Sequence, residues 1–226
     1  MKSVLISIQP KWCELIALGQ KTVEVRKTKP KLETPFKVYI YCTKQGKQFF
    51  HGGIGEKEVL FKNPDTGKIK FDYSFELMHC KNEYTKDNFL SGKVIGEFVC
   101  DQIDEIGYSP EMHGKYISDI DDIHYVSCLN FEQMFDYLAD GYGYAWHISD
   151  LVIYDKPREL SEFKRTCDGN CQECKYAIWE NARWYNEPKI VDCQNITAPQ
   201  SWRYIEERSD KECSSKQKTM TATKTL

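Results

Sequence analysis

The chain has 226 residues, of which 41% are hydrophobic, 29% are charged and 13% are aromatic. This apolar and aromatic content excludes a disordered chain and predicts at least one packed core. The longest apolar runs fall far short of the ~20 residues that span a bilayer, and no secretory leader is recognisable, so we expect a cytoplasmic protein with no membrane partner. The net charge of −3 excludes a globally basic nucleic-acid binder.

Charge is distributed unevenly along the chain. Residues 1–48 contain ten basic and three acidic residues, whereas residues 101–140 contain ten acidic residues and one basic residue, Lys115. This uneven distribution of charge would steer an anionic ligand toward the N-terminal part of the protein. Two solvated faces would give the same pattern, so charge alone leaves both interpretations open.

The first elements alternate between strand and helix. Residues 2–8 are typical of a buried strand, and Pro10 then begins a short helix that Gly19 ends with a left-handed cap. Alternating side chains predict strands over residues 22–26 and 36–43.

Residues 44–91 are expected to form an insertion. Within it, Val59–Phe61 and Lys68–Tyr73 are predicted to pair as a hairpin across a turn that contains Pro64 and Gly67.

The remaining elements are shorter or less regular. We expect a strand at Val94–Cys100, a helix at Phe131–Leu138, a long strand at Tyr144–Tyr154 with a bulge at Ser149-Asp150, and a last strand at Pro199–Glu206.

Many short strands with two short helices predict an α+β fold, a small mixed β-barrel rather than a doubly wound sheet. The expected organisation is a barrel over residues 1–160 that contains the insertion, a cysteine-rich segment with the final strand over residues 161–207, and a disordered tail over residues 208–226.

A charged motif lies where the first helix meets the second strand. In Gly19-x-Lys21-x-x-Glu24-x-Arg26, Glu24 and Arg26 are two residues apart and project to the same side of a strand. A lysine, a carboxylate and a guanidinium together can hold a phosphate or polarise a carbonyl. An exposed edge strand with an ordinary surface ion pair is the alternative interpretation.

The motif and the order of elements resemble the ASCH domain of the PUA-like superfamily, whose signature Gly-x-Lys-x-x-Glu-x-Arg is complete here. The Pro199-Gln200-Ser201-Trp202 segment is similar to the end of ASCH proteins from phages and low-GC Gram-positive bacteria. The resemblance covers roughly residues 1–43, 92–160 and 195–207.

This resemblance implies a PUA-like mixed β-barrel with a cleft beside the motif that takes RNA, a nucleotide or a modified nucleoside. Some relatives hydrolyse the N-acetyl group of N4-acetylcytidine with a lysine, a threonine and a glutamate, and others have been described as ribonucleases. Lys21 matches the catalytic lysine, Glu97 is the expected match for the glutamate, and Glu24 stands at the threonine position. If the protein is an enzyme, Lys21, Glu24 and Glu97 are therefore its catalytic candidates.

Glu97 has two interpretations. It shares a strand face with Ile95 and Val99, and a carboxylate beside the Lys21 amine would be an acid/base pair in the cleft. The alternative is a structural ion pair with Lys21 or Arg26.

Aromatic residues are expected around the same cleft. Tyr41, Trp146 and His147 are predicted ligand-binding residues beside Lys21 and Arg26 because flat side chains next to basic groups can stack on bases, at about 1–3 kcal/mol per contact. The alternative interpretation is that these are core residues, since aromatic side chains are also common in the core of a small barrel.

Four of the ten cysteines form a separate cluster. Cys167-x3-Cys171-x2-Cys174, followed by Cys193, supplies the four thiolates of a closed tetrahedral Zn²⁺ site, which would stabilise a segment too short for its own core. Structural zinc ranks first, an iron–sulfur cluster second, and disulfides or free thiols third.

Three classes of function remain open from the sequence. The first is an RNA- or modified-nucleoside-binding module that uses Lys21, Glu24, Arg26 and Glu97. The second is hydrolysis of a nucleoside amide or of RNA. The third is a protein-interaction module whose contacts lie in the 44–91 insertion or the cysteine-rich segment.

Overall fold

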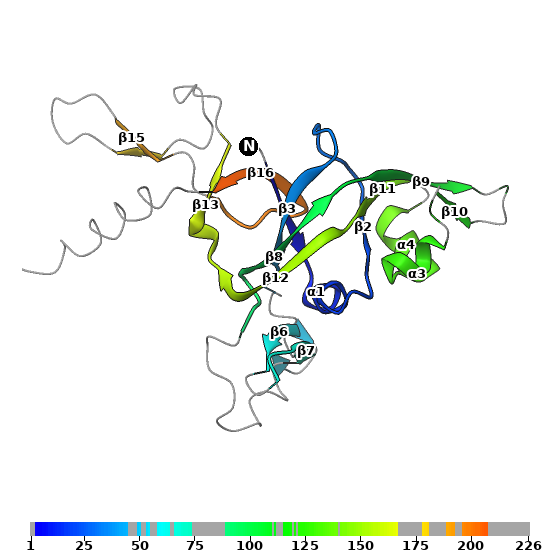
Figure 1. Cartoon of the computed structure of the whole chain (residues 1–226), viewed down its shortest axis with the longest axis horizontal. Helices are drawn as coiled ribbons and strands as arrows, with labels where there is room; N and C mark the ends of the chain where they lie inside the picture. The colour runs from blue at the N-terminus through cyan, green and yellow to red at the C-terminus, as the bar shows by residue number, and fades with distance from the viewer. Residues whose placement is uncertain are drawn as a thin grey trace, which may run out of the picture.

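A computed structural model shows a mixed α+β architecture that consists mainly of strands (Figure 1). The structure describes residues 3–44, 58–63, 66–73, 89–109, 122–139, 141–166 and 196–207, with short pieces at 49–50, 53–54, 111, 115–118, 120, 178–180 and 189–192. Within these ranges, each helix is too short or too polar to cross a membrane.

The larger sheet has six strands in the order β12-β8-β3-β1-β16-β13. Their bounds are Ser149–Arg158 (β12), Val94–Cys100 (β8), Phe36–Cys42 (β3), Ser3–Ile8 (β1), Trp202–Glu207 (β16) and Phe163–Arg165 (β13). β1 and β3 run parallel at the centre of this sheet, and every residue of β1 is buried. A central strand covered on both faces explains the almost continuous apolar run in its sequence.

The smaller sheet has four strands in the order β10-β9-β11-β2. Their bounds are Lys115–Ile117 (β10), Ile103–Ser109 (β9), Tyr142–His147 (β11) and Val23–Arg26 (β2). β8 continues into β9, and β11 continues into β12, so two segments of chain pass from one sheet into the other. The described ladders form two linked sheets rather than one closed ring. The predicted α+β class is confirmed.

Three described helices flank the sheets. α1 (Pro10–Ala17) contacts β3 and the hairpin formed by β6 (Glu58–Lys62) and β7 (Ile69–Tyr73). α3 (Ile123–Ser127) and α4 (Phe131–Leu138) lie against the smaller sheet (Figure 1). Asn130 and Gln133 form a capping box at the start of α4, which explains why this helix begins where the sequence predicts.

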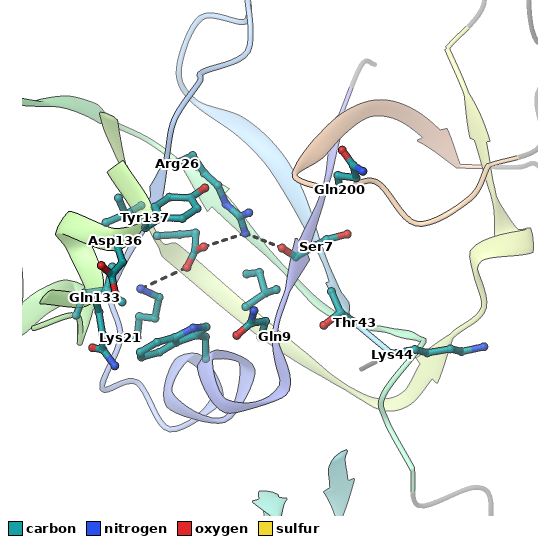
Figure 2. A pocket seen from close by; sticks show the side chains of 15 residues that line it. Ser7, Gln9, Lys21, Arg26, Thr43, Lys44, Gln133, Asp136, Tyr137 and Gln200 are labelled. Atoms are coloured by element: carbon teal, nitrogen blue, oxygen red, sulfur yellow. Dashed lines mark hydrogen bonds and ion pairs between the residues drawn. The ribbon is translucent and has the colours of Figure 1, made fainter. Parts of the chain in front are cut away.

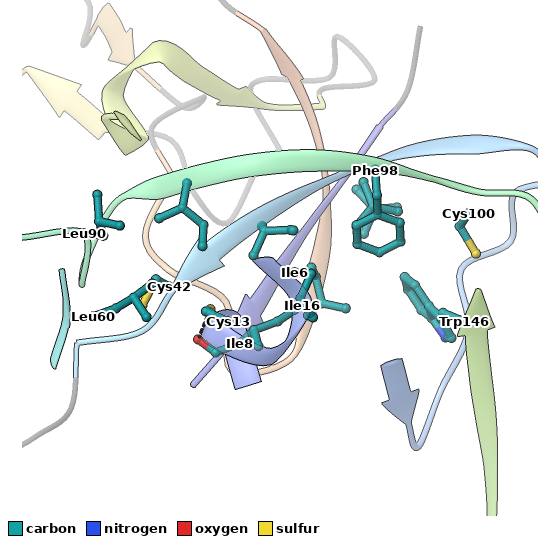
Figure 3. Close-up of a cluster of buried hydrophobic side chains, with 14 of the residues drawn as sticks. Ile6, Ile8, Cys13, Ile16, Cys42, Leu60, Leu90, Phe98, Cys100 and Trp146 are labelled. Atoms are coloured by element: carbon teal, nitrogen blue, oxygen red, sulfur yellow. Dashed lines mark hydrogen bonds between the residues drawn. The ribbon is translucent and has the colours of Figure 1, made fainter. Parts of the chain in front are cut away.

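Apolar side chains gather in three clusters. The largest lies beneath α1 and includes the even-numbered residues of β1 and β3 together with Phe98 and Trp146 (Figure 3). A second cluster joins Val23, Val25 and Ala145 to Met134 and Leu138 of α4. The third covers the opposite face of the larger sheet and contains Leu5, Tyr39, Tyr41, Val94, Phe163 and Ile205. The period-2 alternation of each strand decides to which cluster a side chain belongs.

Several predicted elements are confirmed. β8 and α4 have the predicted bounds, β3 differs by one residue, and β6 pairs with β7 as the expected hairpin. The predicted long strand is two strands, β11 and β12, in different sheets. The expected bulge is present, since the pairing of β12 with β8 shifts between Ser149 and Val152 and Asp150 has a φ of 48°.

Other predictions lie outside the described residues. They concern Cys167, Cys171, Cys174 and Cys193, and the tail over residues 208–226. Within the cysteine-rich segment, the structure describes two short antiparallel strands, β14 (Ile178–Glu180) and β15 (Lys189–Asp192). The sequence did not predict these strands, nor β9, β10 and α3.

Replacing Trp146 by alanine tests its assignment to the core. Trp146 is fully buried and packs edge-on against Phe36, so Trp146→Ala should lower the free energy of unfolding by about 3–5 kcal/mol in urea denaturation. Tyr142, on the same strand, is 79% exposed, so Tyr142→Ala should change stability by no more than about 0.5 kcal/mol. Equal effects of the two substitutions would contradict the assignment.

Candidate functional site

The turn after α1 places Lys21 beneath the smaller sheet. Gly19 has a φ of +70°, a left-handed conformation that glycine adopts without steric cost. The amides of Gln20 and Lys21 both donate to the Leu15 carbonyl, at 2.9 and 3.1 Å, and so close the helix end. The chain therefore turns sharply, and the Lys21 side chain is 2% exposed.

Strand β2 supplies the other two charged groups of the motif. Its valines, Val23 and Val25, point into the cluster under α4. Glu24 and Arg26 therefore point to the opposite side, level with Trp146 and Tyr144 of β11. The strand is at the edge of its sheet, as one interpretation of the sequence predicted, but its charged side chains are buried.

Glu24 lies between two cations. Its Oε1 is 2.8 Å from Arg26 Nη2, and its Oε2 is 3.3 Å from Lys21 Nζ. The same Arg26 Nη2 donates to the Ser7 carbonyl at 2.7 Å, and Lys21 Nζ donates to the Ser127 carbonyl at 2.6 Å. The three side chains, which we call the charged triad, have a net charge of +1 and connect α1, β1, β2 and the end of α3.

Two buried polar atoms of the charged triad have no hydrogen-bond partner among the described residues. They are Glu24 Oε2, whose contact with Lys21 lacks hydrogen-bond geometry, and Arg26 Nε. A buried polar atom without a hydrogen bond is costly. The triad therefore retains hydrogen-bonding capacity beside the cavity.

A cavity of about 670 Å³ opens above the charged triad (Figure 2). This volume lies within the range of small-molecule sites, roughly 300–1,000 Å³. Besides the triad, its lining comprises Ser7, Ile8, Gln9, Trp12, Val25, Thr43, Lys44, Leu129, Gln133, Asp136, Tyr137 and Gln200.

Two aromatic rings border the cavity from different helices. Trp12 of α1 lies beneath Lys21, with Nζ 5.5 Å from its ring centre. Tyr137 comes from α4, one turn after Gln133, so both side chains are on the helix side that faces the cavity. The site thus combines a charged floor, flat apolar faces and side-chain amides.

Glu97 does not line this cavity, which corrects the expectation that it joins the motif. Its neighbour across the ladder is Tyr39, so Glu97 lies on the face of the larger sheet opposite to α1. There its Oε1 accepts a hydrogen bond from Lys37 Nζ at 2.7 Å, and its Oε2 accepts one from the Tyr154 hydroxyl. Burial, followed by the hydrogen bond to Glu97, raises the pKa of Tyr154.

The three predicted aromatic ligand-binding residues also lie outside the cavity lining. Tyr41 is buried in the third apolar cluster, because its strand parity places it on the face that carries Tyr39. Trp146 is buried in the main core. His147 lies on the opposite side of β11 from Trp146, and its Nε2 is 2.6 Å from Asp104 Oδ2.

Metal ligands do not gather in the described part of the chain, where three or more His, Cys, Asp or Glu residues never come close enough to hold an ion. Its isolated cysteines are largely core residues. Cys13, Cys42 and Cys100 are buried free thiols, and burial raises the pKa of Cys100 to about 12. Such thiols are poor ligands and poor nucleophiles at neutral pH.

Sequence reasoning missed most of the cavity wall, including Gln9, Trp12, Gln133 and Tyr137. One signal was present: Gln133, Asp136 and Tyr137 are spaced to share one side of the predicted α4 helix. The sequence did not indicate that this side faces α1.

Comparison with known proteins gives matches only among solved structures. No family model matches the chain, and no curated protein matches it. The chain is similar to the crystal structure of ASCH from Zymomonas mobilis, at 16% identity and a TM-score of 0.45, over 96% of this chain and 94% of that chain. A point mutant of the same protein matches at 16% identity and a TM-score of 0.45, over 96% and 98% of the two chains. Both matches are structures of the same ASCH protein from Zymomonas mobilis.

Neutralising Glu24 tests whether the charged triad depends on it. Glu24→Gln keeps the shape of the side chain but leaves Lys21 and Arg26 buried without a counter-charge, so the free energy of unfolding should fall by about 3–5 kcal/mol in urea denaturation.

The matched control is Glu105→Gln. Glu105 is 72% exposed and pairs with Lys29 at the surface, so this change should cost less than about 1 kcal/mol. If Glu24→Gln is no more destabilising than the control, the triad is not a buried ion-pair network.

Proposed function

We propose that the cavity above the charged triad binds one nucleoside unit, either a modified nucleoside or a nucleotide of RNA. The observation that supports this proposal most directly is the position of Trp12 and Tyr137 at the border of a cavity whose floor is Lys21, Glu24 and Arg26. A base offers both a flat apolar face and polar edges, and these walls and this floor match the two kinds of surface.

The polar groups of the cavity suit the edges of a base. Gln9 and Gln200 each carry one acceptor and two donors. Gln133 offers its amide donors, because its oxygen accepts a hydrogen bond from the Asn130 amide, and Glu24 is an acceptor beside the Arg26 donors. A modified nucleoside adds further polar atoms that these side chains can pair with. The combined lining therefore fits a neutral, amide-rich ring better than a simple anion.

The geometry does not support the predicted acid/base pair of Lys21 and Glu97. Lys21 Nζ donates to the Ser127 carbonyl and pairs with Glu24, whereas Glu97 pairs with Lys37. We therefore propose binding rather than hydrolysis as the activity of this site. A hydrolase of a nucleoside amide or of RNA would instead use Lys21 and Glu24, and product analysis separates the two proposals.

Calorimetric titration tests the binding proposal. The wild-type protein is titrated with the four ribonucleosides, N4-acetylcytidine and a short RNA, and the products are checked by mass spectrometry. At least one of these ligands should bind and remain intact. Tyr137→Ala should weaken its binding by about fivefold or more, because one base–aromatic contact is worth about 1–3 kcal/mol.

Two variants control this experiment. Tyr137→Phe keeps the ring and should bind within about threefold of wild type. Tyr125, on α3, is 77% exposed and outside the cavity lining, so Tyr125→Ala should have no effect. The proposal fails if none of these ligands binds or if Tyr137→Ala binds like wild type. Hydrolysed products would favour the enzyme instead.

We also propose that Cys167, Cys171, Cys174 and Cys193, which lie outside the described residues, hold one structural zinc ion. Protein prepared without chelators should contain about one zinc per chain by elemental analysis, because four thiolates complete a tetrahedral shell. The double change Cys171→Ser and Cys174→Ser should abolish the metal, whereas Cys128→Ser, at an isolated cysteine, should retain it. Iron in place of zinc, or metal-free wild-type protein, would contradict this proposal.

The protein-interaction alternative depended on residues 44–91 and on the cysteine-rich segment. The structure describes both only in part, and this alternative stays a prediction.

A further inference from the structure

The loop between β2 and β3 carries three lysines at alternate positions. Lys27, Lys29 and Lys31 are all exposed, whereas Pro30 between the last two is buried. These lysines account for part of the positive charge of residues 1–48, which the charged triad alone does not explain.

Contacts with the end of the larger sheet hold this loop in place. The Trp202 Nε1 donates to Thr28 Oγ1 at 3.0 Å, and the Lys31 amide donates to the Tyr204 hydroxyl at 2.6 Å. Leu32 packs against the main apolar core. The backbone is therefore fixed on its inner side, while the lysines point outward.

The lysines continue directly from the cavity. Figure 2 shows the chain leaving the cavity beside Arg26 and Tyr137 and rising into this loop. Lys27 Nζ lies 5.3 Å from the ring centre of Tyr137, which borders the cavity. Lys29 Nζ lies 4.8 Å from the ring centre of Tyr144 on the neighbouring strand. Basic groups therefore alternate with aromatic rings along the path that leads from the cavity into this loop.

We infer that the loop binds the phosphates of a single-stranded RNA whose one nucleoside occupies the cavity. This inference rests on the proposed function, and it makes the preferred ligand an oligonucleotide rather than a free nucleoside. Lysine side chains bind phosphates as mobile point charges and release counterions when they do so. Among the described residues, the only acidic partner of these lysines is Glu105, 3.3 Å from Lys29, and this exposed ion pair is weak enough for a phosphate to replace it.

Two carboxylates of the smaller sheet lie near the lysine loop. Asp104 and Glu105 belong to β9, two strands away from β2 in the smaller sheet. Glu105 pairs with Lys29 and Asp104 with His147, so Glu105 is the carboxylate that an RNA phosphate would displace from the loop. An acidic protein segment would suit the lysines too, but it would not use the nucleoside cavity from which they continue.

The test compares ligand lengths in the triple variant Lys27→Gln, Lys29→Gln and Lys31→Gln. Binding of a fluorescein-labelled eight-nucleotide single-stranded RNA is measured by anisotropy between 50 and 300 mM salt, and nucleoside binding is measured by calorimetry. The triple variant should bind the RNA at least tenfold more weakly at 100 mM salt. The slope of log K against log salt should fall by about 2, since each lost contact with a single strand removes about 0.7. Nucleoside binding should stay within twofold of wild type.

A control removes the same charge elsewhere. Lys68, Lys70 and Lys156 are exposed on the β6–β7 hairpin and on β12, and changing all three to glutamine should leave RNA binding and its salt slope unchanged. Both triple variants should match the wild-type melting temperature, because every altered lysine is exposed.

The outcomes separate the two proposals. RNA binding that depends on the loop lysines but not on Tyr137 would overturn the nucleoside cavity, and with it the placement of one RNA nucleoside there, and would retain only the phosphate contacts of the loop. Nucleoside binding without any loss of RNA affinity in the loop variant would overturn the loop inference alone. Wild-type protein that binds no RNA, or that binds polyglutamate in preference to RNA, would also overturn it.

Discussion

A carboxylate buried between an ammonium and a guanidinium is the constraint on which the site depends. Charged groups leave water only at a cost of several kcal/mol each, and their mutual attraction repays it only in a good geometry. Here Glu24 meets Lys21 and Arg26, and both cations also donate to backbone carbonyls, those of Ser127 and Ser7. Four segments of chain must therefore be in place before both cations reach all of these partners, so this network favours one arrangement of α1, β1, β2 and α3.

The charged triad is also the floor of the cavity. Apolar side chains fill the main core beneath α1 and the cluster beneath α4, but the charged triad between them is polar. α4 contributes side chains both to an apolar cluster and to the cavity. Met134 and Leu138 point into the apolar cluster, while Gln133 and Tyr137 face the cavity. The result is a cavity with a polar floor and aromatic walls, which matches the two kinds of surface of the nucleoside that we propose as its ligand.

The sequence predicted local structure well and cross-sheet relations poorly. The alternation of apolar residues and the helix-end residues were enough to predict the bounds of β8 and α4. These bounds depend only on the residues within each element and its cap. The motif at Gly19–Arg26 was correctly expected to bring Lys21 close to Glu24 and Arg26, because its residues are neighbours in the chain.

The errors share one physical cause. Whether Glu97 faces the motif depends on the register of β3 against β8, and that register pairs it with Tyr39 on the far face. Trp146 has the right parity to approach Glu24, but tertiary packing buries it in the core. Trp12 and Tyr137 come from helices 125 positions apart in sequence, and no local pattern indicates that both border one cavity.

Nitrogen-15 NMR of the arginine and tryptophan side chains tests the central claim most directly. The Arg26 Nε–H signal, assigned from an Arg26→Lys spectrum, and the Trp12 indole signal would be followed while a nucleoside that binds in calorimetry is added. The account predicts that both signals shift in proportion to occupancy, because the charged triad is the floor of the binding cavity. A nucleoside that binds while both signals stay unmoved would place the ligand elsewhere and contradict it.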